Sequence, residues 1–191
     1  MASTISAGTT SGTAIAIAGD TTGNLAFQTQ AGANTITVPN STGTIVTTGS
    51  PQSGSVLQVV SSQYNTSFTT SSASMVASGL SASITPKFST SKILAIFSLN
   101  FTSGGANNQA TTTLYRNSTN LALSGGVQTA FGQVYGSAGI VQGGTSASCL
   151  DSPATTSATT YAVYVASTNG GSITAFNNTT TGVITLMEIA G

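Results

Sequence analysis

The most regular alternation of apolar and polar positions in the chain lies between residues 92 and 101. Every second side chain on one face is apolar, namely Ile93, Ala95, Phe97, Leu99 and Phe101. The opposite face also begins with apolar residues, Leu94 and Ile96. This pattern predicts a central strand that is covered on both sides. Pro86 has no N–H to donate to a ladder, so it marks the turn before that strand.

Shorter stretches with strand character follow one another through the rest of the chain and are separated by Gly, Asn, Ser and Pro. Strands are expected within 55–60, 64–70, 80–85, 111–116, 121–123, 127–140, 161–166 and 182–189. This frequent spacing predicts a β-sandwich or barrel rather than alternating strands and helices. We expect an all-β, jelly-roll-like sandwich of two packed sheets. An immunoglobulin-like sandwich is disfavoured because the chain has no Trp and only one Cys.

The first 50 residues have a different texture, with apolar pieces too short to build a core on their own. The pieces lie at 14–17, 25–27, 36–38 and 44–46. Such short strands usually need neighbouring copies of themselves; the alternative is an unstructured tail. We expect residues 1–50 to form a β-rich docking and oligomerisation segment and 51–54 a linker. Residues 55–191 would then form the β-sandwich, which we call the knob.

Charge is nearly absent from this sequence, and that excludes several classes of partner. Charged residues make up 3% of the chain and the formal net charge is zero, against about 25% charged residues in an average domain. Binding to nucleic acid needs a basic patch that displaces counterions, and a polybasic membrane anchor needs the same residues. No apolar run approaches the ~18 residues of a membrane-spanning helix. We therefore expect neither nucleic-acid binding nor membrane insertion.

A surface with so few charges has little electrostatic repulsion between copies. Such a protein is expected to associate, because uncharged Ser, Thr and Asn surfaces mate without the penalty of desolvating ions. The composition therefore favours a component of a larger assembly.

Residues that could carry out catalysis are scarce. The chain has no His, and its only carboxylates are Asp20, Asp151 and Glu188. Asp151 and Glu188 could meet in space as a glycosidase pair. The alternative is structural: Asp20 would make a turn after Gly19, Asp151 would lie in a Ser/Thr-rich loop, and Glu188 would pair with one of the cations Lys87, Lys92 or Arg116. We favour the structural interpretation.

The remaining candidate groups also have structural explanations. Cys149 has no activating cation nearby in sequence and fits a small buried residue. An alternative role for Asp151 is a cation site built with Asn and backbone oxygens. The tyrosines could stack on sugars, although Tyr is also a common strand residue; they are Tyr115, Tyr135, Tyr161 and Tyr164. Glycine pairs such as Gly143–Gly144 fit loop punctuation. We assign no catalytic, cofactor-binding or metal-binding residue.

Several short runs resemble structural proteins of tailed bacteriophages, especially those of cyanobacteria and marine bacteria. The runs are TITVPNSTGTIV at 35–46, VLQVV at 56–60, SITPKFSTSKIL at 83–94, LYRN at 114–117 and TLMEIAG at 185–191. Proteins of this kind are labelled tail-fibre or virion appendage proteins. The resemblance implies a non-enzymatic homotrimer on the virion surface, with a β-rich C-terminal knob and no cofactor.

Two positions on a virion fit this resemblance. A capsid decoration (cement) protein needs only a docking segment and a knob, and its partners would be its own copies and the major capsid protein. A short receptor-binding tail fibre would join tail components and contact a glycan on the host surface. Because 50 residues are few for both an anchor and a shaft, we favour decoration of the outer capsid.

Overall fold

The computed structural model describes residues 25–28, 35–38, 51–105, 107–122, 130–136, 139–177 and 179–191. Contacts divide the chain into two units, Met1–Ile45 and Val46–Gly191. In the first unit, β1 (Leu25–Gln28) and β2 (Thr35–Val38) pair antiparallel, which confirms the strands expected near these positions. The expected strands at 14–17 and 44–46 lie outside the described residues. The division of the chain at 50 and at 51–54 stays a prediction.

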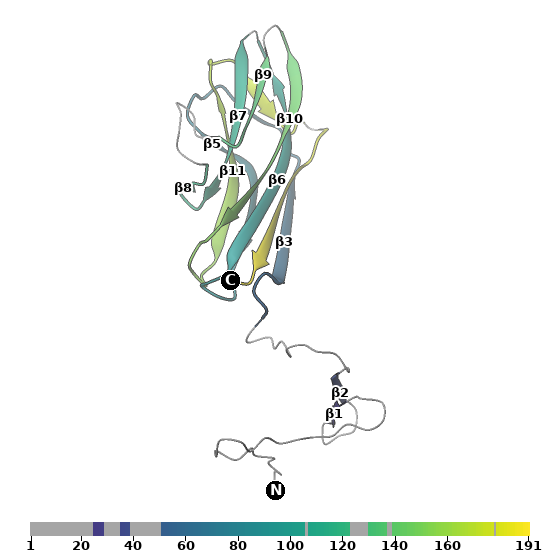
Figure 1. Ribbon diagram of the computed structural model, residues 1–191. Coiled ribbons are helices and arrows are strands. Elements are labelled where there is room, and N and C mark those ends of the chain that lie inside the picture. The colour runs from purple at the N-terminus through teal and green to yellow at the C-terminus, as the bar shows by residue number, and fades with distance from the viewer. Residues whose placement is uncertain are drawn as a thin grey trace. The chain divides into compact units, whose positions relative to one another are not determined.

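The second unit is an all-β sandwich, as predicted (Figure 1). Its strands are β3 (Val56–Tyr64), β4 (Phe68–Thr70), β5 (Val76–Ile84), β6 (Lys92–Ser103), β7 (Asn108–Arg116), β8 (Thr119–Asn120), β9 (Gly132–Gly136), β10 (Val141–Asp151), β11 (Thr159–Ser167), β12 (Ile173–Ala175) and β13 (Gly182–Ile189). The described part of the chain contains no helix that could cross a membrane.

Two antiparallel sheets form the sandwich, and we call them the first and second sheets. The first runs β3-β13-β6-β12-β4, with β10 on the free side of β6; the second runs β5-β11-β7-β8, with β9 also paired to β7. The longer strands are β3, β6, β10 and β13 in the first sheet and β5, β7, β9 and β11 in the second, and along the chain they alternate between the sheets except that β9 follows β7 within the second. This is the eight-strand, double-sheet arrangement of a jelly roll.

Strand β6 is the organising strand of the first sheet, as its alternating pattern predicts. On one side it pairs with β10 from Ile93 to Ser103. On the other side it pairs first with β13 and then with the short β12. The inward side chains of β6 are all buried and pack against the second sheet, including Phe97 and Leu99. Burying a large apolar side chain contributes about 1.5–3 kcal/mol, so this strand supplies a large part of the core.

The expectation that β6 is covered on both faces is wrong. Its outward face is open within this chain, and Ile96 is 37% exposed. An antiparallel sheet can leave one face open, whereas a continuous apolar run suggests a covered strand. Leu94 and Ile96 are therefore apolar for a reason other than burial within the sandwich.

Three strand predictions need correction. The strand expected at 121–123 is wrong, because β8 ends at Asn120 and neither Leu121 nor Ala122 lies in a strand. Residue Tyr64 ends β3 and does not begin the next strand, which is the three-residue β4. Strand β10 was not predicted at all, because Gly143, Gly144 and the serines that follow have low strand propensity. Pairing with β6 over its whole length holds this segment extended.

Candidate functional site

A row of apolar side chains crosses the outer face of the first sheet. In the strand register Met187 lies opposite both Val59 and Leu94, and Leu94 lies opposite Leu150. The row therefore spans four strands, β3, β13, β6 and β10. Its two end members are well exposed, Val59 at 55% and Leu150 at 57%. We call Val59, Met187, Leu94 and Leu150 the apolar row.

Further apolar side chains extend the apolar row along the sheet. Val56 and Ile189 are opposite each other on one side of it, and Ile96 follows Leu94 on the other side. Val56 is 54% exposed. A contiguous apolar surface that stays exposed is typical of a place where another molecule binds. Sequence reasoning missed this surface because it assigned Leu94 and Ile96 to a covered face.

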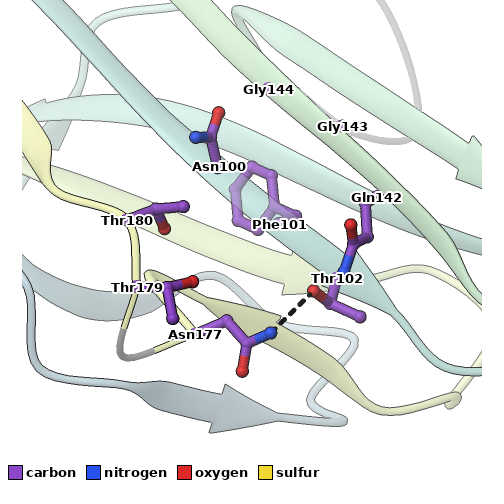
Figure 2. A pocket seen from close by; sticks show the side chains of 9 residues that line it. All are labelled: Asn100, Phe101, Thr102, Gln142, Gly143, Gly144, Asn177, Thr179 and Thr180. Atoms are coloured by element: carbon purple, nitrogen blue, oxygen red, sulfur yellow. Dashed lines mark hydrogen bonds between the residues drawn. The ribbon is translucent and has the colours of Figure 1, made fainter.

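The same face changes character toward the other end of β6. Its outward residues there are Ser98, Asn100 and Thr102, and β10 opposes them with Ser146, Gly144 and Gln142. A cavity of about 320 Å³ opens here. Figure 2 shows its lining: Asn100, Phe101 and Thr102 from β6, Gln142, Gly143 and Gly144 from β10, and Asn177, Thr179 and Thr180 from the loop between β12 and β13. We call this cavity the amide pocket.

Asp151 belongs to a polar cluster that ties the two sheets together. It is the last residue of β10 and not part of a loop, which corrects the sequence expectation. The guanidinium of Arg116, on β7 in the second sheet, donates to both carboxylate oxygens at 2.8 and 2.9 Å. The hydroxyl of Tyr161, on β11, donates to Oδ2 at 2.6 Å. Burial, and then the bond to Asp151, raises the pKa of Tyr161.

Glu188 is fully buried on β13, where hydrogen bonds surround its carboxylate. Its Oε1 accepts from the backbone N–H groups of Lys87 and Phe88, and its Oε2 accepts from the amide of Gln58. Burial raises the pKa of Glu188, but the hydrogen bonds outweigh it and lower the pKa overall. The expected ion pair with a cation is wrong: Lys87 contacts Glu188 through its backbone, and its ammonium donates to the Leu57 carbonyl.

The register brings the two carboxylates into one row of the first sheet. Asp151 and Glu188 both oppose Ile93, one from each side of β6. The buried side chain of Ile93 belongs to the strand between them. Both oxygens of each carboxylate accept hydrogen bonds from fixed protein donors. A glycosidase pair needs an acid with a raised pKa, which is opposite to the shift at Glu188.

The other candidate groups that the structure describes have structural surroundings. The pKa of the Cys149 thiol is raised by burial and by the nearby Asp151 carboxylate, so its nucleophilic thiolate form is disfavoured. Tyr161 is buried, and Tyr115 and Tyr164 stack on each other at 4.1 Å between ring centroids. Asp20 and Gly19 lie outside the described residues. Among the residues that are described, no three His, Cys, Asp or Glu side chains gather as a metal site.

No known family model matches this sequence, and no curated protein is similar to it. The features of this chain that point to a function are therefore those of the outer face of the first sheet.

Proposed function

We propose that this chain is a non-enzymatic structural protein of a bacteriophage virion, a homotrimer that decorates the outer capsid. The observation that carries the proposal is the apolar row. A jelly roll whose outer sheet face carries Val59, Leu94 and Leu150 in register has a surface suited to burial against another protein. The partner that we propose for this face is a second copy of the chain.

The near absence of charge supports association rather than an isolated monomer. Among the residues described in the sandwich, the one ion pair joins Arg116 to Asp151, and it lies on the inner side. The outer positions next to the apolar row include Ser61, Thr185 and Ser148, and Lys92 beside Leu94 is the one charged residue among these neighbours. Interfaces with depleted charge at their centre resemble this composition. The trimeric state and the phage particle come from the sequence resemblance described above.

The arrangement of the acids supports a structural role. Asp151 and Glu188 each stabilise the end of the sandwich near Ile93, and their oxygens are engaged by donors of the protein itself. A general acid or base must instead reach the proton of a substrate. In our proposal both groups hold strands together.

A second candidate function is a short receptor-binding tail fibre that contacts a host glycan. The amide pocket favours this candidate, because a decoration protein needs no polar cavity on its outer face. Both candidates share the trimeric knob and the docking role of residues 1–50, and they differ in their number and place on the particle.

The copy number per particle separates the two candidates. Quantitative mass spectrometry of purified particles should find hundreds of copies of a decoration protein and only a handful of copies of a fibre.

A chain truncated to residues 51–191 should remain folded by circular dichroism and should fail to incorporate into particles. A truncated chain that incorporates at the normal level, or that does not fold, would contradict the proposed division into a docking segment and a knob.

A further inference from the structure

The amide pocket forms where the strand paired to one side of β6 changes from β13 to β12. Strand β13 pairs with β6 as far as Ser98, and β12 takes over at Phe101. Between them the chain leaves the sheet as the loop that contains Asn177, Thr179 and Thr180. The N–H of Phe176 donates to the Asn100 carbonyl at 3.2 Å, which anchors the loop beside β6. The loop therefore forms a wall and β6 and β10 form the floor (Figure 2).

The loop holds a strained shape that packing maintains. Phe176 and Asn177 both have positive φ, 64° and 21°, and a bulky residue such as Phe rarely adopts this conformation. The ring of Phe176 is fully buried and packs edge-to-face against Tyr64 at 5.2 Å between ring centroids. Strain that is held in place by a core contact often accompanies a binding site. The wall of the pocket is thus pre-formed.

Polar groups in the pocket are available to a ligand. In the part of the chain that the structure describes, the amides of Asn100 and Gln142 and the hydroxyl of Thr179 form no hydrogen bond. The hydroxyl of Thr180 is buried and has no partner either. Asn177 donates to the Thr102 hydroxyl at 3.4 Å, which is long for a hydrogen bond. The side chains of Asn100, Gln142 and Thr179 are exposed, so they bond to solvent in the free protein, and a ligand that offers matching donors and acceptors can take the place of that water.

Glycine 144 makes room for the Asn100 amide. A Cβ added at Gly144 would come within 2.5 Å of Asn100 Oδ1. Gly144 therefore has a spatial role in the floor of the pocket, which differs from the loop punctuation that the sequence suggested. This observation also provides a way to disturb the pocket without touching the core.

We infer that the amide pocket binds a neutral saccharide. Sugar hydroxyls both donate and accept hydrogen bonds, and Asn, Gln and Thr side chains offer both functions. None of the lining residues is charged, which gives no partner to an anionic or cationic ligand. The volume of about 320 Å³ lies at the small end of the usual ~300–1,000 Å³ for ligand sites, which suits one or two sugar rings. This inference does not depend on the capsid position proposed above.

Ligand-observed NMR on the full-length protein tests the inference. The probes are glucose, galactose, mannose, lactose and maltose, with N-acetylneuraminic acid as the anionic comparison. We expect saturation transfer to at least one neutral probe at about 10 mM and none to the anionic sugar, because a small polar site binds weakly. Asn100→Ala and Gln142→Ala should each weaken the binding at least tenfold.

The control is Gln63→Ala, which removes an exposed amide from β3 on the same face but outside the pocket. It should leave binding unchanged, and Gly144→Ala should weaken binding while thermal melting stays close to the parent value. The inference is overturned if none of the neutral probes binds, if only the anionic sugar binds, or if the Asn100 and Gln142 variants bind as well as the parent. Particle location and copy number test the proposed function separately.

Discussion

The two ends of β6 have opposite chemistry on their two faces. Near Ile93 the inner side holds the carboxylates of Asp151 and Glu188, while the outer side carries the apolar row. Near Phe101 the inner side is aromatic and apolar, while the outer side carries the amide pocket. At the first end β13, β6 and β10 contribute to both faces, and β3 adds Val59 to the outer one. The core alone does not explain this inversion, because neither outer surface is needed to fill it.

The difference separates two kinds of constraint on one sheet. At inward positions the residue type is constrained by core packing and by the need to pair buried acids. At outward positions the residue type is constrained by the molecule that binds the sheet. We propose that this is another copy of the chain at the apolar end and a neutral sugar at the polar end. Substitutions at each end should therefore have different effects on folding and on binding, and we order them by their effect on folding.

The largest effect is expected at the inner side of the polar end. Phe176→Ala removes a fully buried ring and should destabilise the knob by about 3–5 kcal/mol, as measured by urea unfolding. The amide pocket should be lost as well, because the ring holds its wall. Thr179→Ala in the same loop is the control and should leave unfolding unchanged. A cost below ~1 kcal/mol for Phe176→Ala would show that the ring is not a core anchor.

At the inner side of the apolar end, Glu188→Gln should cost about 2–3 kcal/mol, because a buried carboxylate loses charge-assisted hydrogen bonds. The pKa of Glu188 is lowered from 4.5. Its stabilising contribution is thus complete above pH 4.5 and is lost as the pH falls through the folded-state pKa. Urea unfolding of both proteins across acid pH should show the difference shrinking there. A difference that does not change with pH would contradict this assignment.

A smaller effect is expected from Asp151→Asn, about 1–2 kcal/mol. The ion pair is only partly buried, since the side chains of Arg116 and Asp151 are 27% and 10% exposed, and solvent screens it. A double-mutant cycle with Arg116→Met isolates the pair from other losses. A coupling energy near zero would show that Asp151 acts through Tyr161 instead.

The smallest effect on folding and the clearest effect on association are expected at the apolar row. Leu94→Asp should change the stability of the knob by no more than about 1 kcal/mol, because the position is on the outer face. Multi-angle light scattering should report a trimer for the parent and a monomer for this variant. Ser98→Asp, which places the same charge on the same strand, should remain trimeric. A trimer that survives Leu94→Asp would remove the apolar row from the interface.

Much of the fold was predictable because its signals are local. The alternation from Ile93 to Phe101, the turn at Pro86 and the final strand at 182–189 all follow from side-chain period and turn chemistry. The failures have a common cause. Strand β10 has weak propensity of its own, and the three residues of β12 are too few to show an alternating pattern; both pair with β6. Propensity cannot report a partner that is distant in the chain.

The sequence by itself determined the class of the protein: all-β, nearly without charge, without a His, and built around one strongly alternating strand. Only the tertiary structure decided which apolar residues are core and which are surface, and which acids meet which donors. The physical reason is register. A strand pattern says that Leu94 and Ile93 face opposite ways, but only the neighbouring strands show that Leu94 joins an exposed row and that Ile93 lies between two carboxylates.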